Sequence, residues 1–581
     1  MSHDRGFRPR FNRFMNRWHA RRSARMGTAT AFVNAPEPRT IGSFARGRQL
    51  VAGNYLFAGH LIEGKDQIIW DVTPPTRAFT SDVQGFAWLD DLASVGDGST
   101  RTLAQTWLWS WIDHYGRGTG PGWTPDLTGR RLIRWISHAV FLLRGQDTPA
   151  SQAFFKSLGH QTYFLSKRWH TSEPGLPRFE ALTGLIYAAL ALEGLEDLAA
   201  PAVSALAKEC AQQIDAEGGL PTRNPEELLS VFTLLTWATA ALSEAGKATP
   251  AQHIAAIERI APTLRTLRHA DGSLARFHGG GRGQDGWLDH ALAASGIKKR
   301  QADGLAMGYA RLSAGRTSII VDASVPPKGK ASNGAHASSL AFELISGRRA
   351  LIVNCGSGAS FGPDWRRAGR ATPSHSTLSL DGLSSSRIDG EDQDGYEPLA
   401  DGPTRVPIEI SNASDGLRFQ GGHNGYGLTH GLTHVRTLEL TFDGRGMAGE
   451  DMLLAIENDE KRRFDKSMDA HGLEGIPFAI RFHIHPEVDV ALDLAGAAVS
   501  MALKSGEIWV FRHDGTQTID LQPSVYLEKG RLKPRATQQI VLTGRAMEYA
   551  TRIRWSLSKA QDTAIGVRDL RQDDIDLSFQ G

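Results

Sequence analysis

Two histidines in polar turns are the residues of this chain best suited to proton transfer. His336 lies in Asn-Gly-Ala-His-Ala-Ser-Ser, and His375 lies in Thr-Pro-Ser-His-Ser-Thr. An imidazole exchanges protons near neutral pH, and small neighbouring residues let a ligand approach closely. Either histidine could instead be a hydrogen-bonded structural residue. The pair therefore predicts a candidate acid–base site.

Several arginines are placed where an anion could be bound. Arg366, Arg367 and Arg370 precede the second histidine and could pair with a carboxylate or sulfate through bidentate hydrogen bonds, although a solvated basic loop is the alternative. Arg178 and Arg223 stand at the predicted starts of two helices, where free backbone N–H groups also favour anions. These positions indicate an anionic ligand.

The elements that must position these residues begin with a helical region at about residues 81–300. Its apolar residues recur at intervals of three and four, as in Leu103, Trp107 and Trp111. Turn sequences rich in Gly and Pro separate the helices, and at one joint Asn224 is the expected cap of a helix that begins at Pro225. Successive antiparallel helix pairs bury two faces when they curve round a common axis, so the pattern predicts an incomplete (α/α) toroid.

From about residue 302 the pattern changes to short runs rich in Val, Ile, Phe and Thr, separated by Asp-Gly and Ser-Gly turns. This spacing predicts an antiparallel β-sandwich. The predicted fold class is thus α+β multidomain, with an N-terminal incomplete (α/α) toroid followed by a C-terminal antiparallel β-sandwich. The expected limits are a basic, flexible N-terminal segment at 1–45, the toroid at 46–300 and the sandwich at 301–581.

Composition excludes several classes of protein. The 65 Lys and Arg against 63 Asp and Glu give a net charge of +2 over 581 residues, so no global field for nucleic acid exists. Cys210 and Cys355 fall in different predicted domains, which argues against a disulfide framework and a Cys-rich zinc site. No window holds 18 apolar residues, so no transmembrane helix is expected. The arginines of the first 26 residues are followed by no apolar run, which predicts a basic tail or a surface helix rather than a signal peptide.

The motifs around the two histidines resemble those of the heparinase II/III family of polysaccharide lyases. The similar segments are His336-Ala-x-x-Leu-x-Phe-Glu-Leu, Leu351-Ile-Val-x-x-Gly and Arg370-Ala-Thr-x-x-His375-Ser-Thr-Leu. Leu-Pro-Arg178-Phe-Glu and the segment 218–225 look like the family's helical signatures, and the resemblance covers roughly residues 50–570. It implies a bacterial protein that cleaves an acidic, uronate-containing polysaccharide by β-elimination.

β-Elimination requires a group that neutralises the uronate carboxylate, a base for the C5 proton and an acid for the departing O4. The resemblance implies that the imidazoles of the β-domain face the arginine-bearing helix starts of the toroid. The implied catalytic residues are His336, His375, Arg178, Arg223 and Glu227. The implied substrate-binding residues are Arg367, Arg370, Asn354 and Trp169. The two histidines also match a metal-ligating pair, so a divalent metal such as zinc is a further expectation.

This chain departs from the family pattern at four positions, one of which is the absence of the Asn expected near Arg178. Gly334 stands where active relatives often have a second histidine, and Asn354 stands where several have Asp, which weakens the zinc prediction. A tyrosine expected after Asn224-Pro225 is replaced by Glu226 or Glu227, either of which could act as a base but would repel a uronate. A second hypothesis is therefore a catalytically altered protein for glycan binding or envelope-polysaccharide assembly.

A hydrolase is the third class, because other (α/α) toroids use paired carboxylates. Asp90-Asp91 is the nearest such pair, and we interpret it as a surface turn. The resemblance implies the cell envelope or periplasm, whereas the absence of a recognisable signal peptide leaves the cytoplasm open. An acidic polysaccharide is the expected partner, nucleic acid is not, and the sequence does not indicate the oligomeric state.

Overall fold

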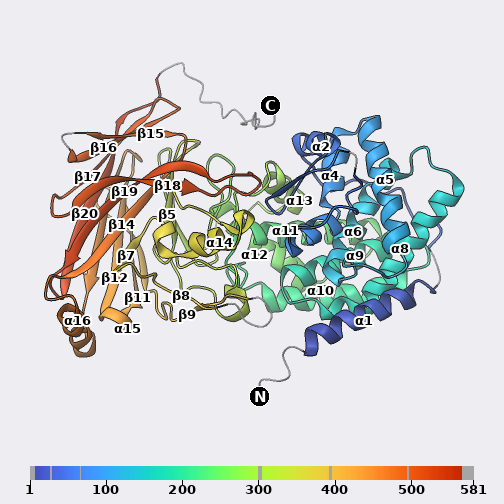
Figure 1. The fold of residues 1–581 in the computed structure, drawn as a ribbon, viewed down its shortest axis with the longest axis horizontal. Coiled ribbons are helices and arrows are strands. Elements are labelled where there is room, and N and C mark those ends of the chain that lie inside the picture. Colours follow the sequence, from blue (N-terminus) through green and yellow to red (C-terminus); the bar gives the residue numbers. More distant parts are fainter. Residues whose placement is uncertain are drawn as a thin grey trace. The chain divides into compact units, whose positions relative to one another are not determined.

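The structure is a computed structural model that describes residues 7–26, 29–65, 67–298, 304–390, 396–493 and 496–564. Helices fill the N-terminal half of the chain and antiparallel strands dominate the C-terminal half (Figure 1). The fold is α+β multidomain, an incomplete (α/α) toroid followed by an antiparallel β-sandwich, and this prediction is confirmed. Within the described residues no helix is long and apolar enough to cross a bilayer.

The chain forms two compact units that exchange segments. The first, the helical unit, comprises residues 1–218, 229–261 and 289–297, and the second, the β unit, comprises 219–228, 262–288 and 298–581. Two stretches from within the helical half of the sequence therefore belong to the β unit. The domain limits expected at residues 45 and 300 stay predictions.

The helical unit is built from long helices and one hairpin. Within the predicted basic N-terminal segment, residues 7–23 form the first helix, and residues 1–6 lie outside the described part. The helices of this half are α1 (Phe7–Ser23), α2 (Phe44–Val51), α3 (Arg77–Gln84), α4 (Ala87–Val95), α5 (Gly98–Tyr115), α6 (Pro125–Ser137), α7 (Ala139–Leu143), α8 (Thr148–Arg168), α9 (Leu176–Ala191), α10 (Ala199–Gln213), α11 (Pro225–Glu244), α12 (Ala251–Thr266) and α13 (Trp287–Ser295), and the hairpin pairs β1 (Asn54–Phe57) with β2 (His60–Glu63).

Close packing between α6 and α9 requires glycine. A Cβ on Gly129 would lie 2.2 Å from the carbonyl oxygen of Glu180, and one on Gly184 would lie 2.4 Å from the Cα of Gly129. No side chain fits at these distances, so the two helix backbones meet directly. The neighbouring core is aromatic, with the buried Trp111 and Trp135 rings 5.4 Å apart in an edge-to-face arrangement.

Asp90 and Asp91 do not form the surface turn that we expected. Both are buried in α4. Asp90 accepts hydrogen bonds from Nε of Arg134 at 3.0 Å and from Nε2 of His138 at 2.9 Å. The carboxylate is thus paired within the helical core, because a buried charge requires a partner of opposite charge.

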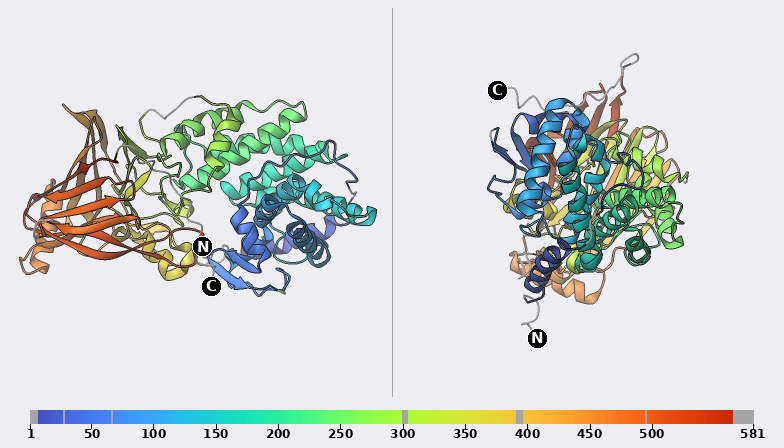
Figure 2. Two further views of the ribbon diagram at one scale, coloured as in Figure 1. Left: turned by 90° about the horizontal axis from the view of Figure 1, so that it is seen from above. Right: turned by 90° about the vertical axis from the view of Figure 1, so that its right-hand side faces the viewer.

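The β unit contains two eight-stranded antiparallel sheets. Their strands are drawn in yellow to red in Figure 2. The first has the order β18-β19-β14-β6-β5-β4-β3, with β7 beside β14. Its strands are β3 (Tyr309–Ala314), β4 (Thr317–Asp322), β5 (Phe342–Ser346), β6 (Arg349–Val353), β7 (Leu378–Leu380), β14 (Ile476–Ile484), β18 (Thr518–Tyr526) and β19 (Arg535–Ala546).

The second sheet has the order β10-β11-β12-β13-β20-β17-β16-β15. Its strands are β10 (Ile408–Asn412), β11 (Gly416–Tyr426), β12 (Leu432–Thr441), β13 (Gly446–Leu454), β15 (Val488–Asp493), β16 (Ala498–Leu503), β17 (Ile508–His513) and β20 (Ala550–Gln561). The connections include β8 (Arg387–Ile388), β9 (Leu399–Ala400), α14 (Pro363–Arg370), α15 (Gly427–His430) and α16 (Asn458–Ala470).

The sandwich core lies between these sheets. Phe342 and Phe482 of the first sheet pack on Trp555 of the second, with ring centroids 6.0 and 4.6 Å from the indole. All three are buried in one hydrophobic cluster that draws on both sheets. Alternation of buried residues along the strands produces this shared core.

One ion cluster is fully enclosed beside that core. Asp451 accepts hydrogen bonds from Nε of Arg436 at 2.8 Å, from Nε2 of His434 at 2.7 Å and from the indole N–H of Trp555 at 2.9 Å. Burial alone would raise the pKa of Asp451, but Arg436 and His434 outweigh it and hold that pKa below its usual value. The carboxylate therefore stays charged and satisfied.

Removing this carboxylate should destabilise the β unit strongly. In Asp451→Ala the Arg436 guanidinium stays buried without its counter-charge, so we expect a loss of about 3–5 kcal/mol in the free energy of unfolding. Urea denaturation followed by circular dichroism measures it. The control is Glu439→Ala, which breaks the exposed ion pair with Arg418 on the neighbouring strand and should cost about 1 kcal/mol or less. Equal losses would contradict the prediction.

Candidate functional site

The β unit brings the two predicted histidines into direct contact. Nδ1 of His336 lies 3.0 Å from Nε2 of His375, and the side chains are 2% and 1% exposed. Nδ1 of His375 donates to the carbonyl of Ala371 at 2.9 Å, because a carbonyl oxygen only accepts. In the neutral ring Nε2 of His375 is then the acceptor and Nδ1 of His336 the donor. The remaining nitrogen, Nε2 of His336, carries a lone pair.

Burial keeps both rings neutral. It lowers the pKa of His375 to about 4. Burial and then the neighbouring His375 lower the pKa of His336 well below its usual value. Near neutral pH neither imidazole is charged, which agrees with the tautomers that the hydrogen bonds require.

The loop after α14 holds the turn that carries His336. Nε of Arg370 donates to the carbonyl of Ala335 at 2.8 Å, and the amide of Ala337 donates to the carbonyl of Arg370 at 2.8 Å. The hydroxyl of Thr372 donates to the carbonyl of Ala337 at 2.7 Å. These three hydrogen bonds involve Ala335 and Ala337, the residues before and after His336. They therefore fix the backbone of His336 against the segment that leads to His375.

Two residues that the sequence did not single out extend the network. The backbone amide of His336 donates to Nδ1 of His278 at 3.1 Å, so the neutral His278 ring carries its proton on Nε2. That nitrogen lies 3.4 Å from Oδ2 of Asp322, which also accepts from the hydroxyl of Ser338 at 2.7 Å. Asp322 ends β4, and its other oxygen accepts from Nη2 of Arg223 at 2.6 Å.

Arg223 is therefore joined to the histidines through Asp322. Its guanidinium also donates to backbone carbonyls between residues 307 and 325, at distances from 2.8 to 3.3 Å. The group is buried and its donors are directed at protein acceptors. In this arrangement Arg223 is a positioning residue.

Backbone strain gathers at this network. Arg223, His278 and Met307 have positive φ angles of 50°, 46° and 52°. Residues without glycine's freedom adopt this region at a cost, and such residues concentrate where function constrains the backbone. Three of them within one hydrogen-bonded cluster make the network the candidate site of this unit.

The carboxylates after Arg223 differ in their surroundings. Asn224 caps α11 as the sequence predicted, accepting from the amides of Glu226 and Glu227 at 3.0 and 3.1 Å. Burial raises the pKa of Glu227. Burial would also raise the pKa of Glu226, but Lys529, 3.0 Å away, and the amide of Gly281 reverse this and lower it. Glu227 is thus the more basic of the two.

The predicted anion-binding arginines converge on a carboxylate of the protein itself. Arg366 pairs with Glu397, and the guanidinium groups of Arg367 and Arg370 lie 3.4 and 3.6 Å from it. Arg367 is exposed, whereas Arg370 is buried. The cluster, which we call the arginine triad, pairs with a carboxylate of the protein itself, and its expected role in binding an anionic ligand stays a prediction.

The remaining predicted residues are divided between the two units. Asn354 is buried in the β unit, where its Oδ1 accepts from the amide of Ser376 at 2.9 Å. Within the described residues its Nδ2 has no hydrogen-bond partner. Arg178 and Trp169 belong to the helical unit, where Nη1 of Arg178 lies 3.3 Å from Glu209. The roles of all nine predicted site residues stay predictions.

The histidine pair does not offer the geometry of a zinc site. The nitrogens that face each other already share a proton, and Asn354 in place of Asp supplies an amide rather than an anion. In the part of the chain that the structure describes, no group of three or more His, Cys, Asp or Glu is arranged to hold a metal ion.

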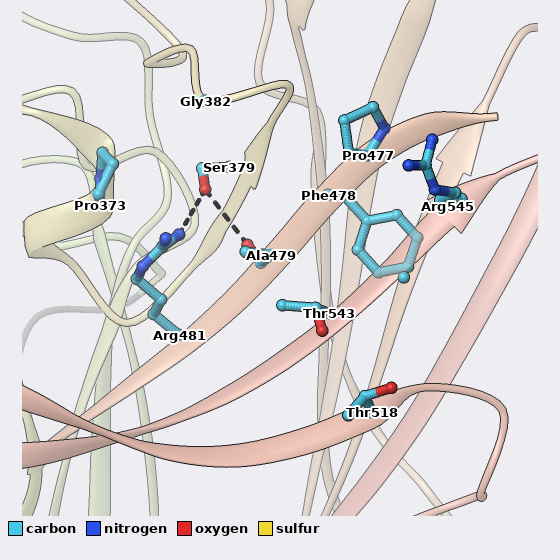
Figure 3. Close-up of a pocket in the computed structure, with 11 residues that line it drawn as sticks. Pro373, Ser379, Gly382, Pro477, Phe478, Ala479, Arg481, Thr518, Thr543 and Arg545 are labelled. Carbon is cyan, nitrogen blue, oxygen red and sulfur yellow. Dashed lines mark hydrogen bonds between the residues drawn. The ribbon is translucent and has the colours of Figure 1, made fainter. Parts of the chain in front are cut away.

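A separate cavity of about 520 Å³ opens on the first sheet (Figure 3). Its lining includes Arg481, Arg545, Ser379, Thr518 and Thr543. Nη1 of Arg481 donates to the hydroxyl of Ser379 at 2.6 Å. Hydroxyls and cations around one hollow suit a polar, anionic ligand.

Comparison with known proteins agrees with this architecture. Residues 296–556 match the family model described as heparinase II/III-like, C-terminal. Over 543 residues the chain is 30% identical to FtsZ-localized protein C of Caulobacter vibrioides, a match that covers 90% of this chain and 89% of that protein.

Two solved structures share the fold at low sequence identity. A crystal structure of heparinase III has a TM-score of 0.66 at 13% identity and covers 93% of this chain and 88% of its own. Heparan sulfate lyase HepC from Pedobacter heparinus has a TM-score of 0.55 at 13% identity, with 95% and 88% covered. A helical toroid followed by this sandwich defines a polysaccharide lyase-like protein. The chain belongs to the heparinase II/III family, and the resemblance seen in its motifs is confirmed.

Acid should destabilise the fold through His375. Its pKa is about 4 when folded, against the ordinary value of 6.5, so between these values the unfolded chain binds the extra proton. The contribution of His375 to the free energy of unfolding is fully present above about pH 6.5. About 3 kcal/mol of this contribution is lost as the pH falls to 4. The slope of the unfolding free energy against pH measures the number of protons taken up on unfolding. In His375→Gln this number should be smaller by about one between pH 4 and 6.5. An unchanged slope in urea denaturation would contradict this assignment.

Proposed function

We propose that this protein cleaves an acidic, uronate-containing polysaccharide, of the kind found in cell envelopes, by β-elimination. The observation that carries the proposal is the direction of the hydrogen bonds in the histidine pair. His336 donates from Nδ1 to His375, which leaves Nε2 of His336 as a neutral proton acceptor. In the reaction Nε2 removes the C5 proton, the C–H electrons form the C4=C5 double bond, and the C4–O4 bond breaks. The departing O4 takes up a proton, so that one unsaturated and one reducing end result.

The low pKa of His336 has two consequences for such a step. It guarantees that the ring is unprotonated at neutral pH, and it also makes the ring a weak base. The C5 proton must therefore be acidified by neutralising the uronate carboxylate. The unpartnered amide N–H of Asn354 and the exposed Arg367 of the arginine triad are the donors that we assign to this task.

The arginine triad contributes to the proposal because it already binds a carboxylate. A uronate that replaces Glu397 would meet the same three guanidinium groups, which could pair with its carboxylate. Within the β unit, Glu227 completes the proposed set as a raised-pKa acid for O4. Arg178 and Trp169 of the helical unit stay a predicted catalytic and a predicted substrate-binding residue.

Glycan binding without cleavage is the second candidate, favoured by two observations. The imidazoles of His336 and His375 are nearly inaccessible, and Arg223 is fully engaged with protein acceptors. The cavity that Arg481 lines could hold an acidic sugar without any base beside it (Figure 3). In this reading the histidine network only stabilises the fold.

Elimination is tested by incubating the purified protein with heparan sulfate, hyaluronan, alginate and polyglucuronate and following the ultraviolet absorbance of the unsaturated product. We expect His336→Gln and His375→Gln to lower turnover by about 10²-fold or more. The matched control is His423→Gln. It removes one ring of another buried pair in the same unit, in which Nε2 of His423 lies 3.2 Å from Nδ1 of His434, and should leave turnover unchanged.

Each outcome of this assay is decisive. No product from the native protein on any polymer would reject elimination of these uronates and leave glycan binding as the candidate. Equal losses of turnover in all three variants, with equally lowered melting temperatures, would show that the predicted pair acts only through stability.

Glycan binding has its own readout. We expect Arg481→Gln to weaken binding of a labelled uronate oligosaccharide by about tenfold, because one charge-assisted hydrogen bond is lost. Fluorescence anisotropy measures the affinity. Arg387→Gln removes an exposed arginine that pairs with Asp389 and Asp401 elsewhere in the β unit and should not change it. Identical affinities of the two variants would exclude the cavity as the binding site.

A further inference from the structure

The outer face of α1 combines aromatic and basic side chains that the proposed glycan chemistry does not use. We propose that this face binds the surface of an anionic phospholipid bilayer, so that the protein is held on a membrane by a helix lying in the interface. The argument rests on how α1 is attached, on which residues it exposes and on their charge.

One side of α1 is fixed to the helical unit. Asn16, Ala20 and Ser23 are buried. The side-chain oxygen of Asn16 accepts from Nε of Arg168, at the end of α8, at 2.7 Å. The orientation of α1 on its own unit is therefore defined, and its opposite side faces outward.

That opposite side carries aromatic rings. Phe11, Phe14 and Trp18 are 50%, 64% and 43% exposed. At about 100° per residue, their spacing of three and four places them within an arc of about 60°, roughly opposite the buried residues. Large apolar side chains gathered on one exposed face mark an interaction surface rather than the scattered exposure of single residues.

Exposed arginines occur along the same helix and just after it. Those between residues 11 and 26 are all exposed, namely Arg13, Arg17, Arg21, Arg22 and Arg25. The stretch 7–26 contains no Asp or Glu. The guanidinium carbon of Arg22 lies 5.2 Å from the centroid of the Trp18 ring. With a net charge of only +2 over the whole chain, this face concentrates positive charge locally.

The combination fits a bilayer better than other polyanions. Phenylalanine and tryptophan insert at the boundary between headgroups and acyl chains, while arginines beside them pair with phosphates. Nucleic acid would bind the arginines through its phosphates, but it would not account for three aromatic rings on the exposed side of the helix. A glycan would stack a sugar on one aromatic ring, whereas this stripe contains three rings on the convex surface of a helix.

The test is flotation of the full-length protein with vesicles. We expect it to float with vesicles that contain phosphatidylglycerol and much less with pure phosphatidylcholine, and added salt should weaken the interaction. Phe14→Ser with Trp18→Ser should reduce binding by about tenfold or more. Arg21→Gln with Arg22→Gln should reduce it by roughly fivefold for each arginine.

The matched control is Val140→Ser with Ile254→Ser, which removes two exposed apolar residues of the same unit outside α1 and should float like the native protein. Melting temperatures of all variants report folding. Absence of flotation by the native protein would overturn the proposal. Binding of duplex DNA that is lost only in the arginine variant would also overturn it. A change of oligomeric state in the Phe14 and Trp18 variant, without any vesicle binding by the native protein, would do the same. None of these outcomes depends on lyase activity.

Discussion

The candidate site depends on the interactions that the buried carboxylate of Asp322 makes with its neighbours. This carboxylate receives the guanidinium of Arg223, the hydroxyl of Ser338 and the nearby imidazole of His278. Burial would raise the pKa of Asp322, yet Arg223 and His278 outweigh burial and lower it. A charge enclosed in this way is tolerated only when every partner stays in place. The turn before Ser338 and the segments that carry Arg223 and His278 are therefore all held to the end of β4.

This constraint explains why the histidine pair is ordered. Because His278 is fixed by Asp322, its free nitrogen accepts from the backbone of His336, and on the other side Ala371 fixes the proton of His375. The direction of every hydrogen bond follows from atoms that can only donate or only accept. The chemistry proposed for His336 is thus a property of the whole chain of contacts rather than of one residue.

The fold could be predicted from the sequence because its signals are local. Apolar spacing of three and four identified the helices, strand-like runs with Asp-Gly turns identified the sandwich, and Asn224 before Pro225 identified the start of α11. Asp90 and Asp91 were misread because two adjacent acids look exposed, whereas the partners of Asp90 lie 44 and 48 residues further along the chain. Pairing over such distances leaves no local pattern.

The candidate site was predictable only in part for the same reason. His336 and His375 stand in distinctive turns, and the structure places them in contact. His278 and Asp322 were missed because their partners are 58 and 99 residues away. The one signal that could have indicated His278 is the run of three glycines that follows it, which allows the unusual backbone of that turn.

The exchange of segments between the two units has a consequence for how the protein is made. Residues 219–228 and 262–288 leave the ribosome well before the strands that they pack against. Until β4 has been synthesised, Arg223 and His278 lack Asp322, so these two stretches cannot yet make their native contacts. The last strands of the chain therefore finish both the sandwich and its inserted loops, and the nascent protein reaches its native state only late in translation.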